Sequence, residues 1–322
     1  MSTIYTDIYT DVEIDISNVC NLKCPLCHRN NFGEEAYSLN SFNMDVSHFE
    51  RLLEVFPNLQ RIYLGFMVCE PTLNPNFIDI VRFIKEKGLN ITLSTNGNTY
   101  DSTSERSENF WKTFLGLLTK DDKIIWPVDG FTEEIYLKYR RGGNLMKVLR
   151  NIERATSIRP DINHTIQTIM FAHNKKEIDE LYEEFKEMYK YRFNLPTWSL
   201  IDCCGDCAML SDEVQPQWDK QQWIKIKSNP PKSPKSFRCE SLDNKIVFVD
   251  HNGRIGFCPT QLTNAVANNP EVPTIFSPLR IINEYCRVVY ANKHNNNICQ
   301  FNCGTLAKLR KEKAGLNGIA TK

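Results

Sequence analysis

The spacing of apolar and polar residues between positions 12 and 201 changes repeatedly between two periods. Short apolar or alternating runs are typical of strands, whereas longer stretches with apolar residues three or four positions apart are typical of helices. The predicted strands are residues 12–17, 61–65, 90–94, 123–128, 162–171 and 197–201. The predicted helices are residues 45–56, 76–87, 105–119, 132–139, 145–157 and 175–190. Strands separated by helices of this length imply parallel strands joined by crossover connections.

This order of elements predicts an α/β fold. Six strands are two fewer than a complete eight-stranded barrel has, so the pattern predicts a partial (β/α)6 TIM-like barrel. In folds with parallel strands, ligands and reacting groups collect at the carboxyl ends of the strands. The loop at residues 18–27, directly after the first predicted strand, falls at this edge.

The pattern changes after the last of these strands. Residues 245–250 and 254–257 are apolar segments joined through Asn252-Gly253, a strong sequence signal for a β-hairpin. A helix is predicted at residues 278–292. These elements predict a small α+β region that is rich in cysteine.

We therefore predict two domains. The first is the partial barrel at residues 1–202, and the second is the small cysteine-rich domain at residues 203–322. The stretch 228–235 is basic and rich in proline, which is typical of a loop or linker. A domain with so few apolar residues gains stability when it binds a metal.

The composition is that of a protein without a strongly charged surface. The chain has 322 residues, 39 basic and 39 acidic side chains, and a pI of about 7.0. This balance gives no electrostatic argument for binding nucleic acid or an anionic membrane. No apolar run approaches the ~20 residues of a membrane span, and the first residues lack the basic and apolar regions of a signal peptide. We therefore expect a cytoplasmic protein that binds neither membranes nor nucleic acids.

The chain contains 12 cysteines, which is a large number for a cytoplasmic protein. That compartment keeps thiols reduced, so metal binding explains them better than a disulfide framework does. Three lie early in the chain, and only Cys69 falls between residues 28 and 202. The late cysteines are Cys203, Cys204, Cys207, Cys239, Cys258, Cys286, Cys299 and Cys303. Two cysteine-rich regions therefore flank a middle that is poor in cysteine.

The early cysteines have the spacing of a metal-binding loop. Cys20, Cys24 and Cys27 are separated by three and two residues. They are one thiolate short of the four that closed zinc or iron–sulfur sites normally use. The fourth ligand comes from elsewhere or is replaced by an open coordination position. Structural zinc, with His28 or a distant residue as fourth ligand, is one alternative. Attachment of c-type haem also matches Cys24-Pro-Leu-Cys27-His28, but it requires export.

Further motifs follow the predicted strands in order. Leu64–Leu73, which contains Cys69-Glu70-Pro71, follows the second strand, and Ser94–Gly97 ends the third. Val128–Gly130 and Tyr139–Gly142 follow the fourth. Together with the cysteine loop, these motifs resemble the signature of the radical S-adenosylmethionine (radical SAM) superfamily. The resemblance covers about residues 10–200.

Two positions depart from the family pattern. Cys69 stands where the family usually has Gly, and Pro127 where it often has Ser. A backbone amide or carbonyl at residues 67–69 can still meet the methionine amine of SAM. The Cys69 side chain is expected to crowd or alter that pocket.

The resemblance implies a cofactor and a reaction. Cys20, Cys24 and Cys27 would each bind one iron of a [4Fe-4S] cluster, and the fourth iron would stay open for the amine and carboxylate of SAM. An electron from the cluster would then cleave SAM to methionine and a 5′-deoxyadenosyl radical that abstracts a hydrogen from the substrate. In such enzymes the protein contributes positioning and the exclusion of water and oxygen.

The resemblance also implies contacts to SAM. Glu70 and the neighbouring backbone would hold the methionine amine, and Ser94 or Asn96 would lie near the ribose. Arg140 or Arg141 would pair with the carboxylate, to which a planar guanidinium is suited. The full set is Cys69, Glu70, Ser94, Asn96, Asp129, Arg140 and Arg141. The ordinary alternatives are a solvated carboxylate at Glu70, surface roles for the arginines, and a simple turn at Asn96-Gly97.

Part of the late cysteine set resembles the twitch and SPASM extensions of radical SAM enzymes. Cys239 is followed by Gly253 and then, after four intervening residues, by Cys258, with Cys299 and Cys303 farther on. This sparse array resembles the shorter twitch form, which implies one auxiliary [4Fe-4S] cluster held by these four cysteines. Structural zinc is the competing interpretation.

The other late cysteines have no place in that pattern. The run Cys203-Cys204-Gly-Asp-Cys207 stays unexplained, and Cys286 on a predicted helix is expected to be a small buried hydrophobe. Our hypothesis is a radical SAM enzyme that acts on a peptide or small-molecule substrate and takes electrons from a reductant such as flavodoxin or ferredoxin. The alternative from another class is a non-catalytic, zinc-stapled binding protein.

Overall fold

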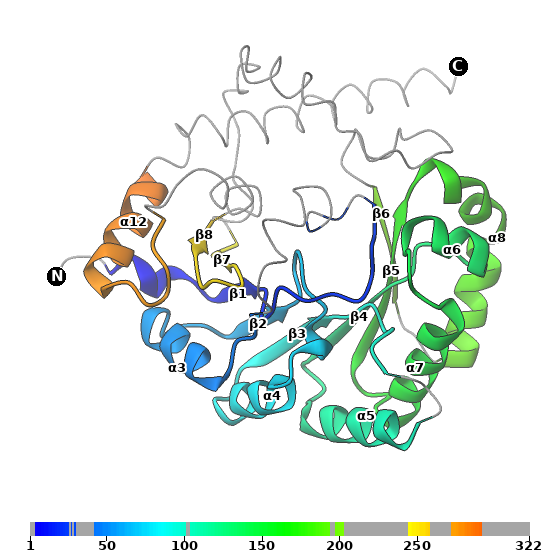
Figure 1. Cartoon of the computed structure of the whole chain (residues 1–322), viewed down its shortest axis with the longest axis horizontal. Helices are drawn as coiled ribbons and strands as arrows, with labels where there is room; N and C mark the ends of the chain where they lie inside the picture. Colours follow the sequence, from blue (N-terminus) through cyan, green and yellow to red (C-terminus); the bar gives the residue numbers. More distant parts are fainter. Residues whose placement is uncertain are drawn as a thin grey trace, which may run out of the picture.

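A computed structural model of the chain contains one mixed sheet flanked by helices (Figure 1). It describes residues 4–25, 27, 29, 42–100, 104–193, 197–202, 244–257 and 272–291. The strands are β1 (Asp11–Ile14), β2 (Arg61–Leu64), β3 (Asn90–Ser94), β4 (Lys123–Pro127), β5 (Asn163–Met170), β6 (Thr197–Asp202), β7 (Ile246–Val249) and β8 (Ile255–Gly256). The sheet has eight described strands in the order β6-β5-β4-β3-β2-β1-β7-β8.

The described α-helices lie where the sequence predicts helices, and two short 3-10 helices, labelled η, were not predicted. They are η1 (Tyr5–Ile8), α3 (Val46–Val55), η2 (Pro71–Leu73), α4 (Phe77–Glu86), α5 (Glu105–Leu117), α6 (Glu133–Tyr139), α7 (Leu145–Ile158), α8 (Ala172–Phe193) and α12 (Leu279–Ala291). Asp45, Ser104 and Thr132 cap the starts of α3, α5 and α6 with their side chains, and Asn144 caps α7. Such caps satisfy backbone N–H groups that a helix leaves free at its start.

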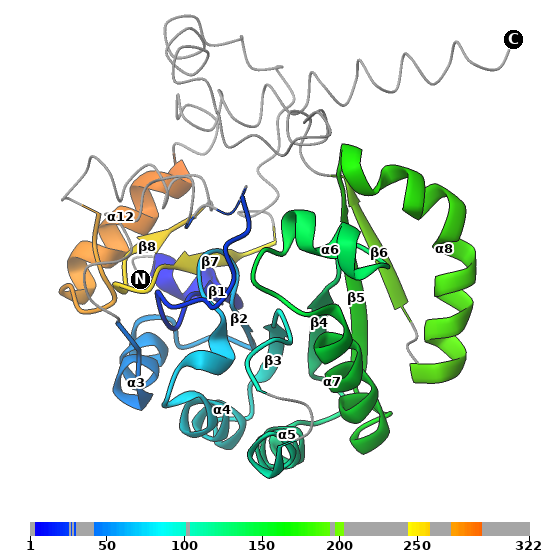
Figure 2. The ribbon, with the colours of Figure 1, turned by 45° about the vertical axis from the view of Figure 1, so that its right-hand side comes forward.

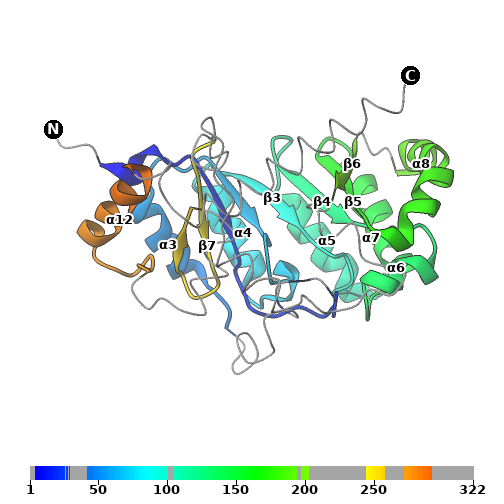
Figure 3. The ribbon, with the colours of Figure 1, turned by 90° about the horizontal axis from the view of Figure 1, so that it is seen from above.

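The sheet is curved and open. Strands β1 to β6 are parallel neighbours, with β6 at one edge of the sheet and β8 at the other. Figure 2 shows α3, α4, α5, α7 and α8 in an arc on the outer side of the sheet. Seen from above, α12 and α8 lie at opposite ends of the molecule (Figure 3). The prediction of a partial (β/α)6 barrel is confirmed.

Successive side chains along each strand face either the apolar core under the helices or the interior of the barrel. Ile91 and Leu93 of β3 and Trp126 of β4 are buried against the helices, where the ring of Trp111 lies 5.4 Å from that of Trp126. Thr92, the residue between the two buried β3 residues, points to the opposite face because successive strand side chains alternate. The barrel interior therefore presents polar side chains between apolar ones.

The predicted hairpin at residues 245–257 extends the barrel sheet. Strand β7 pairs in parallel with β1, with Ile14 opposite Val249, and β8 pairs with β7 in the antiparallel direction. Gly253 in the turn has a φ of 74°, a left-handed conformation that favours glycine. The sequence placed this hairpin in a second domain, and the structure places it in the same sheet as the barrel strands. The division at residue 202 stays a prediction.

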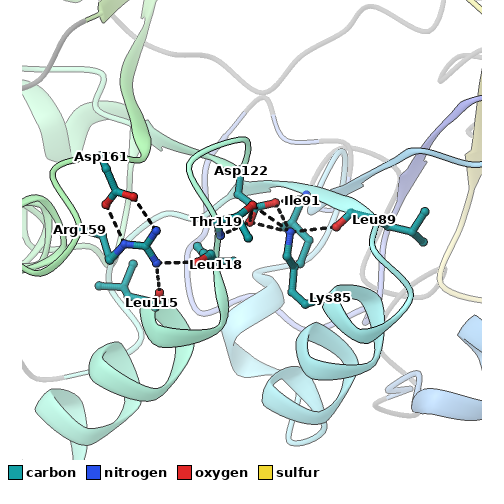
Figure 4. Close-up of polar contacts among 9 residues, drawn as sticks. All are labelled: Lys85, Leu89, Ile91, Leu115, Leu118, Thr119, Asp122, Arg159 and Asp161. Atoms are coloured by element: carbon teal, nitrogen blue, oxygen red, sulfur yellow. Dashed lines mark hydrogen bonds and ion pairs between the residues drawn. The ribbon is translucent and has the colours of Figure 1, made fainter.

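A polar network fixes the opposite, amino-terminal end of β3 and β4 (Figure 4). The buried Asp122 carboxylate accepts hydrogen bonds from the backbone N–H groups of Ile91 (2.6 Å) and Thr119 (2.6 Å) and pairs with Lys85 at 2.8 Å. Nearby, Arg159 donates to the carbonyl oxygens of Leu115 and Leu118 at the end of α5. Asp122 thus ties together β3, α4 and the turn before β4.

We expect Asp122→Ala to lower the free energy of unfolding by about 3–5 kcal/mol, because it leaves the largely buried Lys85 ammonium without its counter-ion and two backbone N–H groups without an acceptor. Chemical denaturation measures this loss. The neighbouring Asp121 is exposed, so Asp121→Ala is the matched control, with an expected change within about 0.5 kcal/mol. Equal midpoints for the two variants would contradict the assignment.

Candidate functional site

The cysteine loop lies at the carboxyl ends of the parallel strands. Leu22 and Cys24 are buried in one contact group with Tyr139 and Phe171, and Cys20, Cys27 and Ile169 pack against the same group. Two backbone hydrogen bonds fasten the loop: Lys23 donates to the carbonyl of Arg141 at 2.9 Å, and Glu70 donates to that of Val19 at 2.9 Å. The structure therefore brings the three predicted ligands together on one apolar support.

The three sulfur atoms lie in a poorly solvated environment. Burial raises the pKa of the Cys20 and Cys24 thiols to about 11 and also raises the pKa of Cys27. The Cys20 sulfur accepts a hydrogen bond from the N–H of Leu22 at 3.5 Å. In the metal-free protein these groups are therefore thiols, and a bound cation would ionise them.

Two centres, a single zinc ion and an iron–sulfur cluster, use cysteine thiolates such as those of the loop. Within the described part of the chain, no three His, Cys, Asp or Glu side chains converge on a point that would hold a single metal ion. A lone zinc ion needs its sulfur ligands about 2.3 Å away. The ligands of a cluster bind different irons and stand farther apart. Three cysteines that pack on one buried contact group supply the donor set that a cluster uses.

Glu70 connects the loops that follow β2 and β3. Its side chain is 2% exposed, and one oxygen accepts hydrogen bonds from the hydroxyls of Thr72 (2.6 Å) and Thr95 (2.6 Å). The other oxygen accepts from the N–H of Asn96 at 2.7 Å. Burial raises the pKa of this carboxyl, against the donated hydrogen bonds, which lower it. Glu70 is thus a buried anchor and not the solvated loop carboxylate of the ordinary alternative.

Asn96 is directed toward the cysteine loop. Its amide nitrogen donates to the side-chain oxygen of Asn21 at 2.9 Å and lies 3.8 Å from the sulfur of Cys20. Its amide oxygen accepts from the N–H of Asn98, and the Asn98 side chain donates to the hydroxyl of Tyr136 at 3.0 Å. Asn96 therefore positions the first cysteine. Its predicted place near the ribose stays a prediction.

Cys69 points toward a carboxylate that sequence reasoning missed. Its thiol donates to Asp15 at 3.3 Å, and the same carboxylate accepts from the N–H groups of Met67 (3.2 Å) and Val68 (3.2 Å). Burial raises the pKa of Asp15 to about 7. The signal was available, because Asp15 follows β1 directly and, like Glu13, is an acidic residue that alternates with apolar residues in the predicted strand 12–17.

Ser94 lies at the end of β3 on the inner face of the barrel, where its hydroxyl is hydrogen-bonded to Tyr63 of β2. Glu13 of β1 lies in register with Tyr63. Burial and the charges of Asp15 and Asp11 raise the pKa of Glu13 to about 7. The inner wall near the cysteine loop is therefore polar and carries acidic groups.

The structure distinguishes the two adjacent arginines. Arg140 donates to Asp129 at 2.5 Å, its side chain is 13% exposed, and its guanidinium carbon lies 5.2 Å from the ring of Tyr139, which packs in one group with Cys24. Burial alone would lower the pKa of Arg140, but the charges of Asp129 and Cys24 raise it. Arg141 is exposed and contributes its backbone carbonyl to the loop at Lys23. Only Arg140 therefore brings its guanidinium to the contact group on which the cysteines pack.

The late cysteines can be assessed only in part. Cys286 is fully buried in the core on α12, as predicted. The others lie outside the described residues, namely Cys203, Cys204, Cys207, Cys239, Cys258, Cys299 and Cys303.

No described helix is long and apolar enough to cross a membrane.

Comparison with known families decides the superfamily. A family model described as the radical SAM superfamily matches residues 14–185, which is more than half of the chain. The chain belongs to the radical SAM superfamily. Members of this family of enzymes use a [4Fe-4S] cluster and SAM, and the matched segment contains all three cysteines of the loop. The comparisons give no support to a non-catalytic, zinc-stapled protein.

Curated relatives match only parts of the chain. A tungsten-containing aldehyde ferredoxin oxidoreductase cofactor-modifying protein from Pyrococcus furiosus is 37% identical over 87 residues, covering 26% of this chain and 23% of that protein. A probable GTP 3′,8-cyclase from Pyrococcus abyssi is 25% identical over 151 residues, covering 46% of this chain and 44% of that one. This radical SAM chain thus spans less than half the length of either relative.

A solved structure supports the fold. Streptococcus suis SuiB bound to its precursor peptide SuiA superimposes with a TM-score of 0.59 at 12% identity, covering 90% of this chain and 67% of SuiB. At this identity the likeness extends to the fold and no further. It agrees with the open parallel sheet of this radical SAM protein.

Proposed function

We propose that this protein reductively cleaves SAM to a 5′-deoxyadenosyl radical and uses it to abstract a hydrogen from a peptide or small-molecule substrate. The observation that carries the proposal is the gathering of Cys20, Cys24 and Cys27 on one buried support at the carboxyl ends of the strands. When bound, the cluster supplies the electron for cleavage of the carbon–sulfur bond.

Different residues around the loop would bind the cluster and the separate parts of SAM. The three cysteines would hold the cluster, and Glu70 would keep the 67–70 backbone in place for the methionine amine of SAM. Glu70 suits this role because its carboxylate joins the loops after β2 and β3. Ser94, on the inner face, would meet the ribose. Unused N–H groups of Arg140 would meet the carboxylate.

The substrate would bind against the inner wall of the barrel. This wall carries Glu13, Tyr63 and Thr92 from three neighbouring strands, in register with one another. Polar side chains fixed on strands can orient a substrate. SuiB was solved with its precursor peptide, and a GTP cyclase name occurs among the relatives, so both substrate classes stay open. Electrons would come from a reductant such as flavodoxin or ferredoxin.

We further propose one auxiliary [4Fe-4S] cluster held by Cys239, Cys258, Cys299 and Cys303 in a second domain at residues 203–322. Support comes from the hairpin of β7 and β8, which lies between the first two of these cysteines in the sequence. Its turn at Gly253 is the one that the twitch-like spacing requires.

The proposed activity is tested anaerobically. The full chain is reconstituted with iron and sulfide, reduced with dithionite, and given SAM. We expect 5′-deoxyadenosine and methionine in equal amounts, measured by liquid chromatography. If the protein binds zinc in place of iron and forms neither 5′-deoxyadenosine nor methionine, the proposed enzymatic activity is refuted. If both products form without an added substrate, the same centre cleaves SAM without coupling to a substrate.

A further inference from the structure

Asp15 is a buried carboxylate that directly follows β1 and precedes the cysteine loop. Its side chain is 0% exposed, and its backbone N–H donates to the carbonyl of Val249 on β7 at 3.1 Å. Ile14 packs in the core, so the Asp15 side chain, which is the next along the chain, points to the interior of the barrel. The sheet therefore holds this carboxylate in a fixed place.

The Asp15 carboxylate holds the loop after β2 through three donors. One oxygen accepts from the N–H of Met67 at 3.2 Å and from the thiol of Cys69 at 3.3 Å. The N–H of Val68 donates to both oxygens, at 3.3 and 3.2 Å. The Glu70 carboxylate, in contrast, accepts from groups farther along the chain. Asp15 is thus the side chain that sets the orientation of the backbone at residues 67 and 68.

The direction of the Met67 carbonyl follows from this anchor. The N–H and C=O groups of a planar trans peptide point to opposite sides, and none of the described peptide bonds is cis. Because the Val68 N–H points to Asp15, the carbonyl of the same peptide points away from it. The thiol of Cys27 donates to this Met67 oxygen at 3.8 Å. The Met67 carbonyl therefore faces the cysteine loop.

A bound cluster would remove the Cys27 donor from this carbonyl, because iron binds thiolate sulfur, which has no proton to donate. A carbonyl in a poorly solvated place is stabilised when another donor takes that position. The methionine part of SAM carries an ammonium group with three N–H donors. We propose that Asp15 is a positioning residue for SAM, which fixes the 67–68 peptide so that the Met67 carbonyl accepts the methionine ammonium beside Cys27. The inference rests on the proposed function and adds the residue that holds the binding backbone in place.

The test measures SAM binding to the reconstituted full chain before reduction, by titration of the cluster absorbance. We expect Asp15→Ala to raise the Kd of SAM about tenfold or more, because the 67–68 peptide loses its anchor. The KM for SAM in 5′-deoxyadenosine formation should rise with it. The kcat at saturating SAM should change less than about threefold, which is typical of a loss of binding alone.

Two further variants complete the binding experiment. Asp15→Asn keeps one acceptor oxygen in the same shape, so it should fold and should raise the Kd of SAM only about threefold. This variant carries the test if Asp15→Ala does not fold. Asp11→Ala is the control, since it removes a carboxylate that is 29% exposed at the amino end of the same strand. Its Kd should stay within about twofold of wild type.

Hydrogen exchange of the reconstituted chain without SAM measures the anchor itself. In Asp15→Ala the N–H groups of Met67 and Val68 should exchange about tenfold faster or more, since their acceptor is lost. The same peptide in Asp11→Ala should exchange at the wild-type rate. Faster exchange together with weaker SAM binding and normal iron content supports the inference.

The contrary outcomes are distinct. Wild-type SAM affinity in the Asp15 variants that take up the cluster would overturn the inference, and faster exchange with unchanged affinity would show that Asp15 has a purely structural role. Either result leaves the proposed function intact, because the wild-type protein still cleaves SAM. A wild-type protein that takes up a cluster and neither binds nor cleaves SAM would refute the proposed function and the inference together.

Discussion

Replacement of Cys20, Cys24 and Cys27 by alanine is expected to reduce 5′-deoxyadenosine formation to the level of the reaction without protein. The three thiols are the only cysteines in the described barrel that pack on the buried group of Leu22 and Tyr139. Without them the cluster has no ligands, and an electron cannot reach SAM. The iron content of the reconstituted variant measures the second centre in the same experiment.

The iron count has two informative values. About four irons per chain should remain if four late cysteines hold one cubane cluster. If no iron remains, the proposal of an auxiliary cluster is refuted, and the proposal of a SAM-binding cluster at the loop is unaffected. The control is Cys286→Ala, since Cys286 is buried in the core on α12 and does not contact the loop. This control should retain full iron and product, and a triple variant with wild-type product would refute the assignment of the loop.

The fold followed from the sequence because each strand and helix carries its own period. Strand β3 has the predicted bounds, and α4 lies one residue inside its predicted bounds at each end. The position of the hairpin was not predictable in the same way. Pairing of Asp11–Ile14 with Ile246–Val249 joins segments more than 200 residues apart, and only tertiary packing selects it. The edge strand β1 would otherwise leave its backbone groups unpaired.

The candidate site was predictable as a set of loops but not as a set of contacts. The motifs mark where Glu70, Asn96 and Arg140 lie because each follows a strand. Whether a side chain in a loop turns toward a sulfur, a carboxylate or solvent depends on backbone angles that sequence patterns do not specify. The sequence could not therefore separate Arg140 from Arg141, although only Arg140 is largely buried against Tyr139 and Arg141 is exposed.

We expect Glu70→Gln to slow SAM cleavage about 100-fold, because misplacement of a binding backbone by about 1 Å has an effect of this size. The carboxylate accepts from Thr72 and Thr95 on one oxygen and from Asn96 on the other. A glutamine has one acceptor oxygen and one NH2 donor, so the backbone N–H of either Thr72 or Asn96, which donate to different carboxylate oxygens, would face another donor. The free energy of unfolding should fall by about 1–3 kcal/mol.

The Glu70 prediction is measured by the rate of 5′-deoxyadenosine formation and by chemical denaturation of the metal-free protein. The exposed Glu86 on α4 supplies the matched control, and Glu86→Gln should change neither quantity. Iron content should stay at the wild-type level in both variants, because neither glutamate contacts a cysteine sulfur in the described structure. A slow but iron-replete Glu70→Gln places the defect in the SAM pocket and not in the cluster. If Glu70→Gln keeps the wild-type rate of SAM cleavage and the wild-type free energy of unfolding, Glu70 has no role in the SAM pocket.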